Sequence, residues 1–212
     1  MSVVVGRVGD GGVWLAADAR LTNTYTGYRD GGFAKIQACG TSLVGSTGTP
    51  LWASFIRRYE GDPADERSIE EFGLAWVRWA KSEGDGCDTN GAPVGCMLVA
   101  TQRGELWEVC NDGGVTRIPR FHAIGSGAPF ALGALHCGVG ASRAVAVAIA
   151  CDACCGGEVQ VRCVARAPDP EHFSHWAQCA RCEATDRARG FPVDSTRCER
   201  CAPKEGPCSE AR

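Results

Sequence analysis

The sequence lacks any long apolar run and any excess of charge of one sign. Among its 212 residues no stretch approaches the roughly 20 apolar residues that cross a bilayer, and the start has no basic region leading into an apolar signal segment. The formal net charge is -3, without the block of like charge that attracts nucleic acid or membrane surfaces. We therefore expect a cytoplasmic protein with no membrane partner.

Cysteine is abundant, with 14 residues. Because no signal segment is visible, a reducing compartment is expected, where paired cysteines indicate metal binding or chemistry more often than disulfides. Six cysteines precede residue 152, and most of these six are expected to be small core residues. The six are Cys39, Cys87, Cys96, Cys110, Cys137 and Cys151.

The organisation of the chain changes near residue 165. With 44% hydrophobic residues the chain has enough apolar side chains for one core of ordinary size. After a linker at about 165–171, which contains Pro168 and Pro170, the segment is dense in Cys, Arg and Glu and poor in aliphatic residues. We predict one domain at 1–165 and a small Cys-rich module at 166–212.

The pattern within the first domain predicts an α+β fold. Residues 2–8 and 13–17 are β-rich and are separated by Gly-Asp-Gly-Gly, so they should form a hairpin, and 34–38 with 43–46 should extend its sheet. Helices are expected at 50–58 and at 68–82, the second opened by a capping box at 68–71. Its Phe72, Trp76 and Trp79 are interpreted as core residues. Further strands are expected at 95–101, 105–109, 115–118, 121–124 and 158–165, and further helices at 129–137 and 141–150.

This order of strands and helices fits a four-layer αββα sandwich, with two sheets packed face to face and helices on both outer sides.

Five ordered motifs within residues 2–165 resemble one known family. They are Asp18-x-Arg20-x-Thr22, Ala34-Lys35-Ile36, Leu43-Val44-Gly45-Ser46-Thr47-Gly48, Gly125-Ser126-Gly127-Ala128-Pro129, and Asp152-x-x-Cys155-Gly156-Gly157. In sequence and spacing they are similar to motifs of proteasome β-subunits and of the HslV peptidase, which are N-terminal-nucleophile (Ntn) hydrolases. Cys155 stands where that family usually has serine.

The resemblance implies a role for each matched residue. Counting back from Asp18 by the family's spacing places the nucleophile on Ser2, which removal of Met1 would expose, in place of the family's usual threonine. Lys35 would lower the proton affinity of the Ser2 hydroxyl, Asp18 would orient Lys35, and the Gly48 N–H would bind the oxyanion. The remaining implied catalytic residues are Ser126, Asp152 and Cys155, and the implied substrate-binding residues are Arg20, Leu21, Thr22, Ser46, Thr47 and Thr49.

The chemistry explains why such a nucleophile must be the first residue. A hydroxyl is a poor nucleophile near neutral pH and needs an adjacent base, which can be the residue's own α-amine, with a pKa of about 8 in model compounds. Serine keeps the hydroxyl but loses the methyl group that restricts the χ1 angle of threonine.

The departures at Ser2 and Cys155 leave a second interpretation open. It is a catalytically inactive member of the same fold that acts as a ring or scaffold component, with the Cys-rich module binding protein or nucleic acid. Retention of both Asp18 and Lys35 favours the peptidase, because an inactive homologue has no need for a buried lysine with its partner.

The C-terminal segment has the pattern of a structural zinc site. Two Cys-x2-Cys pairs, Cys179/Cys182 and Cys198/Cys201, are separated by 15 residues, which lets two turns meet around one tetrahedral ion. Four thiolates leave no open coordination position, so the zinc would stabilise the fold. Free thiols or disulfides are the alternative, and His172, His175 or Cys208 could replace one ligand.

The partners are inferred from the resemblance alone. It implies a peptide or unfolded-protein substrate, a homo-oligomeric ring that encloses the active sites, and an ATPase unfoldase as a possible partner. Basic and acidic residues are mixed in the C-terminal segment, so nucleic acid is not the expected ligand.

Overall fold

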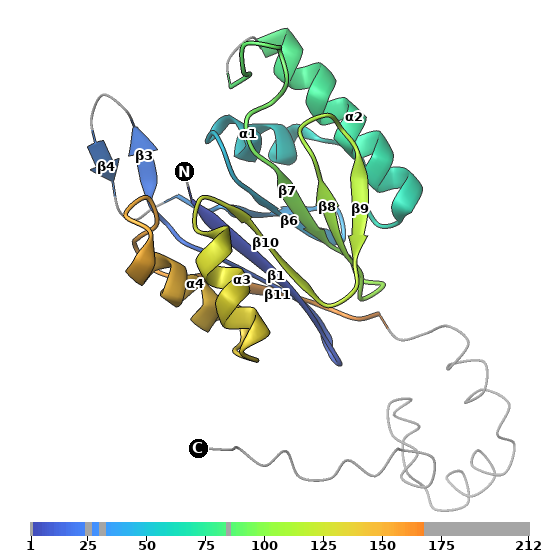
Figure 1. Cartoon of the computed structure of the whole chain (residues 1–212). Helices are drawn as coiled ribbons and strands as arrows, with labels where there is room; N and C mark the ends of the chain where they lie inside the picture. The colour runs from blue at the N-terminus through green and yellow to red at the C-terminus, as the bar shows by residue number, and fades with distance from the viewer. Residues whose placement is uncertain (1, 24–26, 30–32, 84–85, 168–212) are drawn as a thin grey trace, which may run out of the picture. The chain divides into compact units, whose positions relative to one another are not determined.

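The computed structural model of the chain describes residues 2–23, 27–29, 33–83 and 86–167 (Figure 1). They belong to the first of the two units into which the chain divides, residues 1–167. The four cysteines of the predicted zinc site lie outside the described residues, so that site and the boundary after residue 165 stay predictions. None of the described helices is long and apolar enough to span a membrane.

Two antiparallel sheets form the centre of the fold. The four-stranded sheet has the order β10-β1-β2-β11, so β1 lies inside it with a partner on each edge. Its strands are β1 (Val3–Gly9), β2 (Gly12–Ala17), β10 (Phe121–Gly125) and β11 (Gln160–Ala165). The five-stranded sheet has the sequential order β5 (Ile36–Cys39), β6 (Ser42–Ser46), β7 (Met97–Ala100), β8 (Leu106–Val109) and β9 (Val115–Ile118).

The described residues also form four helices and one short hairpin. The helices are α1 (Leu51–Arg58), α2 (Glu66–Glu83), α3 (Ala128–His136) and α4 (Ala141–Cys151). The hairpin consists of β3 (Leu21–Asn23) and β4 (Gly27–Arg29). The predicted α+β fold, with two antiparallel sheets and four helices, is confirmed.

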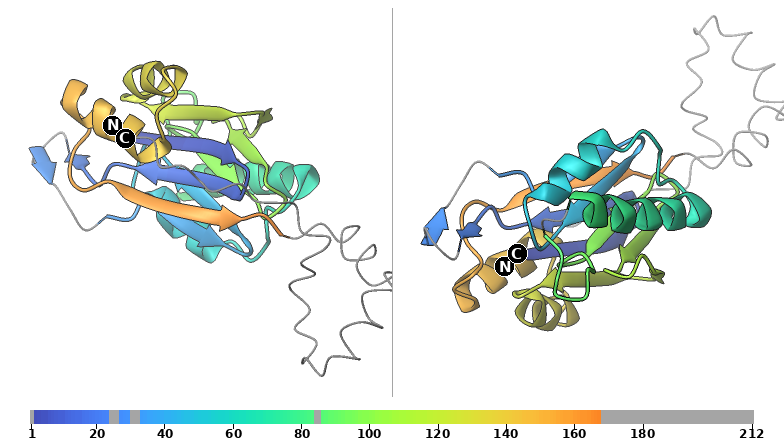
Figure 2. Two further views of the ribbon diagram at one scale, coloured as in Figure 1. Left: turned by 90° about the horizontal axis from the view of Figure 1, so that it is seen from below. Right: turned by 90° about the horizontal axis from the view of Figure 1, so that it is seen from above.

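The helices and the two sheets form four layers (Figures 1 and 2). Three hydrophobic clusters lie between these layers. One lies between α1, α2 and the five-stranded sheet, and another between α3, α4 and the four-stranded sheet. The third, which includes Val4, Leu15 and Leu98, fills the space between the two sheets. Strands β1 and β7 alternate their side chains between two of these clusters, as the period of two in a β-strand requires. The layers therefore follow from burying both faces of each sheet.

The pairing of several strands differs from the prediction. Residues 34–46 were expected to extend the sheet of the first hairpin, but β5 and β6 open the five-stranded sheet instead. Strand β10, for which no partner was predicted, follows β9 in the chain but pairs with β1 in the other sheet. Local apolar alternation predicts a strand but carries no information on its partner, so these pairings appear only in the structure.

The cap of α2 lies three residues earlier than predicted. The carboxylate of Asp65 accepts the backbone N–H of Ser68 at 3.0 Å, and the Ser68 hydroxyl accepts the N–H of Asp65 at 3.0 Å. This is a reciprocal capping box with Asp65 as N-cap and Ser68 at its third helical position. Its hydrogen bonds from Ser68 hold the pKa of Asp65 below its usual value.

Most of the cysteines expected in the core are not fully buried. Only Cys39 of the six is buried, while Cys87, Cys96 and Cys110 are half-buried and Cys137 and Cys151 are exposed. The predicted core residues Phe72 and Trp76 are fully buried, and Trp79 packs against them. The large aromatic side chains, rather than the thiols, fill the core on the α1–α2 side.

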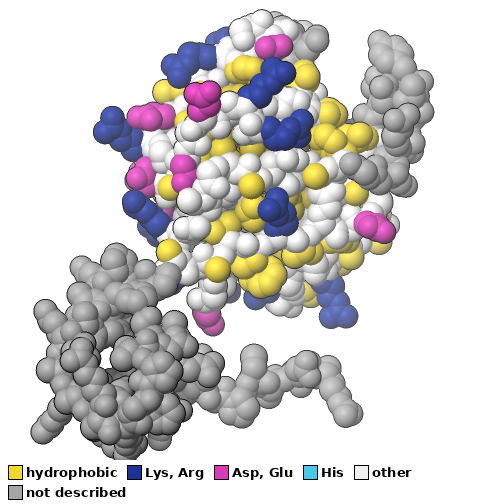
Figure 3. Space-filling view, turned by 180° about the vertical axis from the view of Figure 1, so that it is seen from behind, with side chains coloured by type: hydrophobic (Ala, Val, Ile, Leu, Met, Phe, Trp, Pro, Cys, Tyr) yellow, Lys and Arg dark blue, Asp and Glu magenta, His cyan; other side chains and the backbone are white. Residues whose placement is uncertain are grey.

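The surface of the described part carries charges of both signs. On the face that Figure 3 shows, Lys and Arg side chains lie beside Asp and Glu side chains, with hydrophobic groups between them. This agrees with the small net charge of the chain and gives no strong field of one sign on that face.

Candidate active site

Ser2 immediately precedes β1, an interior strand of the four-stranded sheet. It is 3% exposed. Its carbonyl oxygen accepts hydrogen bonds from the Gly127 N–H at 3.4 Å and from the Ser126 hydroxyl at 3.4 Å. The next amide, Val3 N–H, donates to Asp18 Oδ1 at 2.9 Å. The backbone on the C-terminal side of Ser2 is therefore fixed by two different segments of the chain.

Asp18 and Lys35 form a buried ion pair beside this strand. Asp18 follows β2, Lys35 precedes β5, and the Lys35 Nζ to Asp18 Oδ1 distance is 2.6 Å, with side chains 4% and 0% exposed. The second oxygen of Asp18 accepts the N–H of Gly156 at 3.1 Å and the N–H of Arg20 at 3.3 Å. A buried pair of charges is tolerated when additional hydrogen bonds satisfy it, as they do here.

The environment of Lys35 shifts its pKa by two opposing effects. Burial lowers the pKa of Lys35, while the charge and the hydrogen bond of Asp18 oppose this shift. The net effect is a pKa below the usual value, because removal of the ammonium group from water outweighs its attraction to the carboxylate. A buried lysine with a lowered pKa releases its proton at lower pH than an exposed lysine does.

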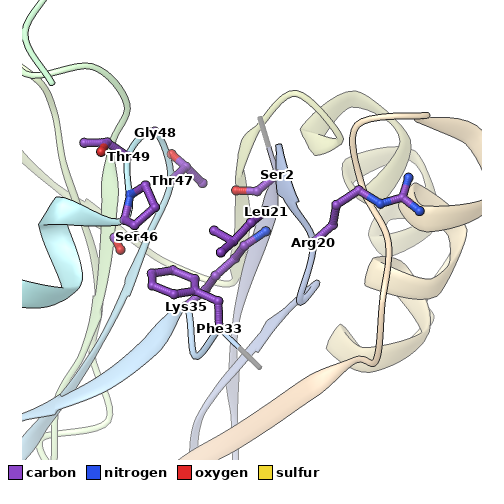
Figure 4. Close-up of a pocket in the computed structure, with 10 residues that line it drawn as sticks. Ser2, Arg20, Leu21, Phe33, Lys35, Ser46, Thr47, Gly48 and Thr49 are labelled. Carbon is purple, nitrogen blue, oxygen red and sulfur yellow. The ribbon is translucent and has the colours of Figure 1, made fainter. Parts of the chain in front are cut away.

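A small pocket lies in front of Ser2 (Figure 4). Figure 4 shows the Ser2 hydroxyl on the side of the Thr47–Gly48 turn and the Lys35 amine extending toward Ser2. The free volume is about 30 Å³. The pocket is lined by Ser2, Arg20, Leu21, Phe33, Lys35, Ser46, Thr47, Gly48, Thr49 and Pro50.

The turn after β6 requires glycine at position 48. Gly48 has φ of +104°, and a Cβ added there would collide with the carbonyl oxygen of Val94. The same carbonyl accepts the indole N–H of Trp52 at 2.9 Å, which ties α1 to this turn. The turn is thereby held in one conformation, with the backbone of Gly48 at the pocket.

The predicted group of Ser126, Asp152 and Cys155 comes together behind Ser2. The Cys155 thiol donates to Asp152 Oδ2 at 3.3 Å, and the N–H of Cys154 donates to Asp152 Oδ1 at 2.9 Å. Burial acts to raise the pKa of Asp152, but hydrogen bonds from Cys154, Ser126 and Cys155 outweigh it, so the net shift is downward.

The surroundings of Cys155 favour its protonated thiol form. It is 1% exposed, and burial, followed by the charges of Asp18 and Asp152, raises its pKa to about 12. A protonated thiol donates a hydrogen bond to Asp152 as the hydroxyl of serine would, although more weakly. The exchange of serine for cysteine therefore keeps the contact.

The predicted substrate-binding residues are only partly together. Leu21, Ser46, Thr47 and Thr49 line the pocket. Arg20 lines it too, but its guanidinium donates to the carbonyl oxygen of Ala153 at 2.7 Å and points away from Ser2 in Figure 4. Thr22 lies in β3 and its side chain is outside the described part.

The sequence interpretation did not include Gln160. The side-chain oxygen of Gln160 accepts the Lys35 N–H at 3.0 Å, and its amide group donates to the carbonyl oxygen of Phe33. Gln160 is the first residue of β11 and lies opposite Ala17 of β2 in the sheet. A polar residue at the start of a strand, shortly after the Gly156-Gly157 turn, is the signal that was available.

Replacing Gln160 by Ala is expected to reduce the rate of any reaction that depends on Lys35 by about 10-fold or more, because a small displacement of a reacting group is costly. The unfolding free energy should fall by only about 1–3 kcal/mol, as expected when buried backbone groups lose their partners. Gln160→Glu keeps the acceptor for the backbone N–H of Lys35 and loses the donor to Phe33. Its rate and its unfolding free energy should therefore lie between those of wild type and Gln160→Ala. Equal rates for wild type and Gln160→Ala would show that the hydrogen bonds of Gln160 are not needed to position Lys35.

No group of three or more His, Cys, Asp or Glu side chains with metal-binding geometry occurs within residues 2–23, 27–29, 33–83 and 86–167.

The fold is that of HslV-like proteins. The BPH of Thiobacillus denitrificans in complex with epoxomicin aligns with a TM-score of 0.64 and 21% identity, over 78% of this chain and 100% of that chain. Another structure of the same BPH gives a TM-score of 0.64 and 24% identity over 79% and 100%. The HslV of Trypanosoma brucei gives 0.55 and 16% over 77% and 99%.

Comparisons by sequence add no further relative, since neither a family model nor a curated protein matches the chain. At these levels of identity the likeness establishes the fold. The predicted resemblance to proteasome β-subunits and HslV is therefore confirmed for the fold.

Proposed function

We propose that the chain is a proteasome-like peptidase of the Ntn-hydrolase class, with Ser2 as the N-terminal nucleophile once Met1 is removed. The observation that carries this proposal is the buried Lys35–Asp18 ion pair, which lies at one pocket with Ser2. An ion pair that is costly to bury persists where chemistry uses it. The fold of BPH and HslV supports the same class.

Proton transfer from the Ser2 hydroxyl needs a base within reach. The free α-amine of Ser2, with a pKa of about 8 in model compounds, is a base of suitable strength near neutral pH. Lys35, charged and adjacent, favours the alkoxide form, and Asp18 fixes the position of Lys35. The hydroxyl oxygen then attacks the carbonyl carbon of the peptide, and the amine later returns the proton to the leaving nitrogen.

The oxyanion formed in this attack requires a hydrogen-bond donor. The backbone N–H of Gly48 is the candidate, because its turn is rigid and borders the same pocket. One such donor contributes roughly 3–4 kcal/mol to transition-state stabilisation. The neighbouring backbone of Thr47 and Thr49 would bind the peptide as an added strand, with Ser46 in the specificity pocket.

The peptidase proposal is tested by intact mass before and after treatment with a β-lactone probe for N-terminal nucleophiles, with Ser2→Ala as control. Loss of Met1 and one added label that disappears in Ser2→Ala are the expected results. Ser2→Thr should be labelled as well, since it keeps the hydroxyl. Retained Met1 together with no labelling would overturn the proposal and leave a scaffold of the same fold.

We further propose that the peptidase acts on peptides or unfolded proteins within a homo-oligomeric ring, served by an ATPase unfoldase in the cytoplasm. The support is the HslV-like fold alone. Sedimentation of the full chain tests the assembly, with a single large species expected and a monomer at all concentrations contradicting it.

A structural zinc ion in the C-terminal segment is proposed from the spacing of Cys179, Cys182, Cys198 and Cys201. The purified full chain is expected to hold one zinc per chain by elemental analysis, and Cys182→Ser should lose most of it. Cys163→Ser, which removes an exposed thiol on β11, is the matched control and should keep the metal. Because the zinc would be structural, its removal by a chelator is expected to leave Ser2 labelling unchanged.

A further inference from the structure

Two half-buried cysteines face each other at the end of the five-stranded sheet. Strands β7 and β8 are antiparallel with Met97 opposite Val109, so the next step of the same register places Cys96 opposite Cys110. The backbone N–H of Asn111 points to the Cys96 thiol. The Cys96 sulfur therefore lies against the peptide that joins Cys110 to Asn111.

The hydrogen bonds around this pair show which kind of cross-strand position it is. Cys96 N–H donates to the Thr47 hydroxyl at 3.2 Å, and Cys110 N–H donates to the Gly114 carbonyl at 2.8 Å. The two carbonyl oxygens accept from Thr47 and Gly113. Neither cysteine uses its backbone groups to bind the other, which defines a non-hydrogen-bonded pair.

This geometry suits a disulfide. In a non-hydrogen-bonded antiparallel pair the Cα atoms are about 4.5 Å apart, within the range of about 4.4–6.8 Å that a disulfide spans. The Cβ atoms of such pairs are about 4.5–5.5 Å apart, whereas a disulfide needs about 3.5–4.5 Å. Closing the bond therefore draws the two strands together by up to about 1 Å.

The movement would act on the turn that contains Gly48. The backbone of Cys96 is joined to Thr47 by Thr47 N–H to the Cys96 carbonyl oxygen at 3.0 Å and by the bond from Cys96 N–H described above. Gly95 lies against the Thr47 carbonyl so closely that a Cβ there would collide with it. The backbone at residues 95–96 and that of Thr47 are hydrogen-bonded and in close contact. A shift of Cys96 therefore displaces Thr47 and the adjacent Gly48.

We propose that Cys96 and Cys110 form a redox pair, and that their oxidation to a disulfide displaces the Gly48 turn and slows the reaction of Ser2. The effect on Ser2 rests on the proposed peptidase function, whereas formation of the disulfide does not.

The oxidant is a low-molecular-weight disulfide such as oxidised glutathione. The Cys110 thiolate attacks it, forms a mixed disulfide and releases one glutathione thiolate. The Cys96 thiolate then attacks the Cys110 sulfur and releases the second. In total the two protein thiols lose two electrons and two protons, and one reagent disulfide becomes two thiols.

The charges around the pair make the reaction slow. Burial, followed by Glu108, Cys110 and Asp112, raises the pKa of Cys96 to about 11, and burial with the same two carboxylates raises that of Cys110. Glu108 in turn lies 3.3 Å from His122, measured between Oε2 and Nε2. Oxidation should therefore accelerate as pH rises, because the thiolate is the reacting form.

Disulfide mapping tests the bond directly. After incubation of the full chain with oxidised glutathione, blocking of free thiols and digestion with trypsin and Asp-N, Cys96 lies in peptide 88–103 and Cys110 in peptide 104–111, each with no other cysteine. The expected product is a species in which these two peptides are linked by a disulfide. Its mass is the sum of the two peptide masses minus two hydrogen atoms, and dithiothreitol should separate it into the two peptides. Oxidation of exposed Cys137 and Cys151 without this linked product would overturn the proposal.

Labelling of Ser2 tests the consequence. In oxidised wild type the labelling rate is expected to fall about 10-fold or more, and dithiothreitol should restore it. Cys110→Ser and Cys110→Ala, both checked for folding by circular dichroism, cannot form the bond and should label under the same oxidant as fast as untreated wild type. The control Cys163→Ser removes an exposed thiol but retains the pair, so the oxidant should slow it as it slows wild type. An unchanged rate in protein that contains the mapped disulfide would overturn the coupling to Gly48. No labelling even in reduced wild type would instead count against the peptidase and leave the mapped disulfide standing.

Discussion

Replacing Asp18 by Asn is expected to lower the free energy of unfolding by about 3–5 kcal/mol, the range observed when one partner of a buried ion pair is removed. The side chain of Asp18 is fully buried and accepts hydrogen bonds from Lys35, Val3 and Gly156. Asparagine has one acceptor atom where the carboxylate has two, so its amide group would face a backbone N–H. Chemical denaturation at neutral pH measures the loss.

The destabilisation of Asp18→Asn should decrease as pH rises. Without the carboxylate, the folded-state pKa of Lys35 falls further below the unfolded value of about 10.4. Between these two pKa values the unfolded chain binds more protons than the folded one, so stability rises with pH. The part of the loss that depends on the Lys35 charge is fully present below the folded-state pKa of Lys35 in the variant and is gone above its folded-state pKa in wild type. The part that comes from the backbone hydrogen bonds of Asp18 does not change with pH.

Glu71→Gln is the matched control for Asp18→Asn. Glu71 pairs with Arg67 on α2, but these side chains are 60% and 89% exposed. Loss of such a surface pair should change the unfolding free energy by no more than about 0.5 kcal/mol, with no special dependence on alkaline pH. Equal effects of the two substitutions would contradict the assignment of Asp18–Lys35 as a structurally essential pair.

Replacing Lys35 by Met is expected to reduce the rate of Ser2 labelling by at least about 100-fold. Methionine keeps the length and the apolar stem of lysine but removes the positive charge beside the Ser2 hydroxyl. Positioned acid–base and electrostatic groups contribute factors of about 100 or more in such reactions. The rate of probe addition, followed by intact mass across a pH series, is the measurement.

The control for Lys35→Met is Lys81→Met, which removes an exposed lysine from the last turn of α2. It should label at the wild-type rate. Circular dichroism of Lys35→Met must show the native fold, since Asp18 is left buried without its counter-charge. A folded Lys35→Met protein that reacts as fast as wild type would exclude Lys35 from the mechanism.

The main elements of the fold were predictable because their signals are local. The hairpin of β1 and β2 is marked by its glycine-rich turn, and the apolar stripe of α2 with Phe72 and Trp76 has helical spacing. The short β3–β4 hairpin was missed because three-residue strands are too short to show a period. Which sheet β5, β6 and β10 join depends on contacts between distant segments, which local pattern does not encode.

In the candidate site too, residues marked by local motifs were predicted and those that depend on strand pairing were not. Ordered motifs indicated Ser2, Asp18 and Lys35, and the structure places all three beside one another. Gln160 was not predicted, because its role depends on the pairing of β11 with β2 and not on its own neighbours in the chain. The same is true of the opposition of Cys96 and Cys110, which appears only once the register of β7 and β8 is known.

The way the backbone is held on the C-terminal side of Ser2 has a practical consequence for producing the protein. Val3 N–H and the Ser2 carbonyl are both fixed by the fold, whereas nothing in that arrangement depends on the Ser2 nitrogen being a free amine. A purification tag fused ahead of Ser2 would therefore leave a normal spectrum and a normal melting temperature. Yet the nitrogen would be an amide, which has no basic lone pair, so such a preparation should be folded and chemically silent. A tag at the other terminus, or one removed so that serine is the first residue, avoids this false negative.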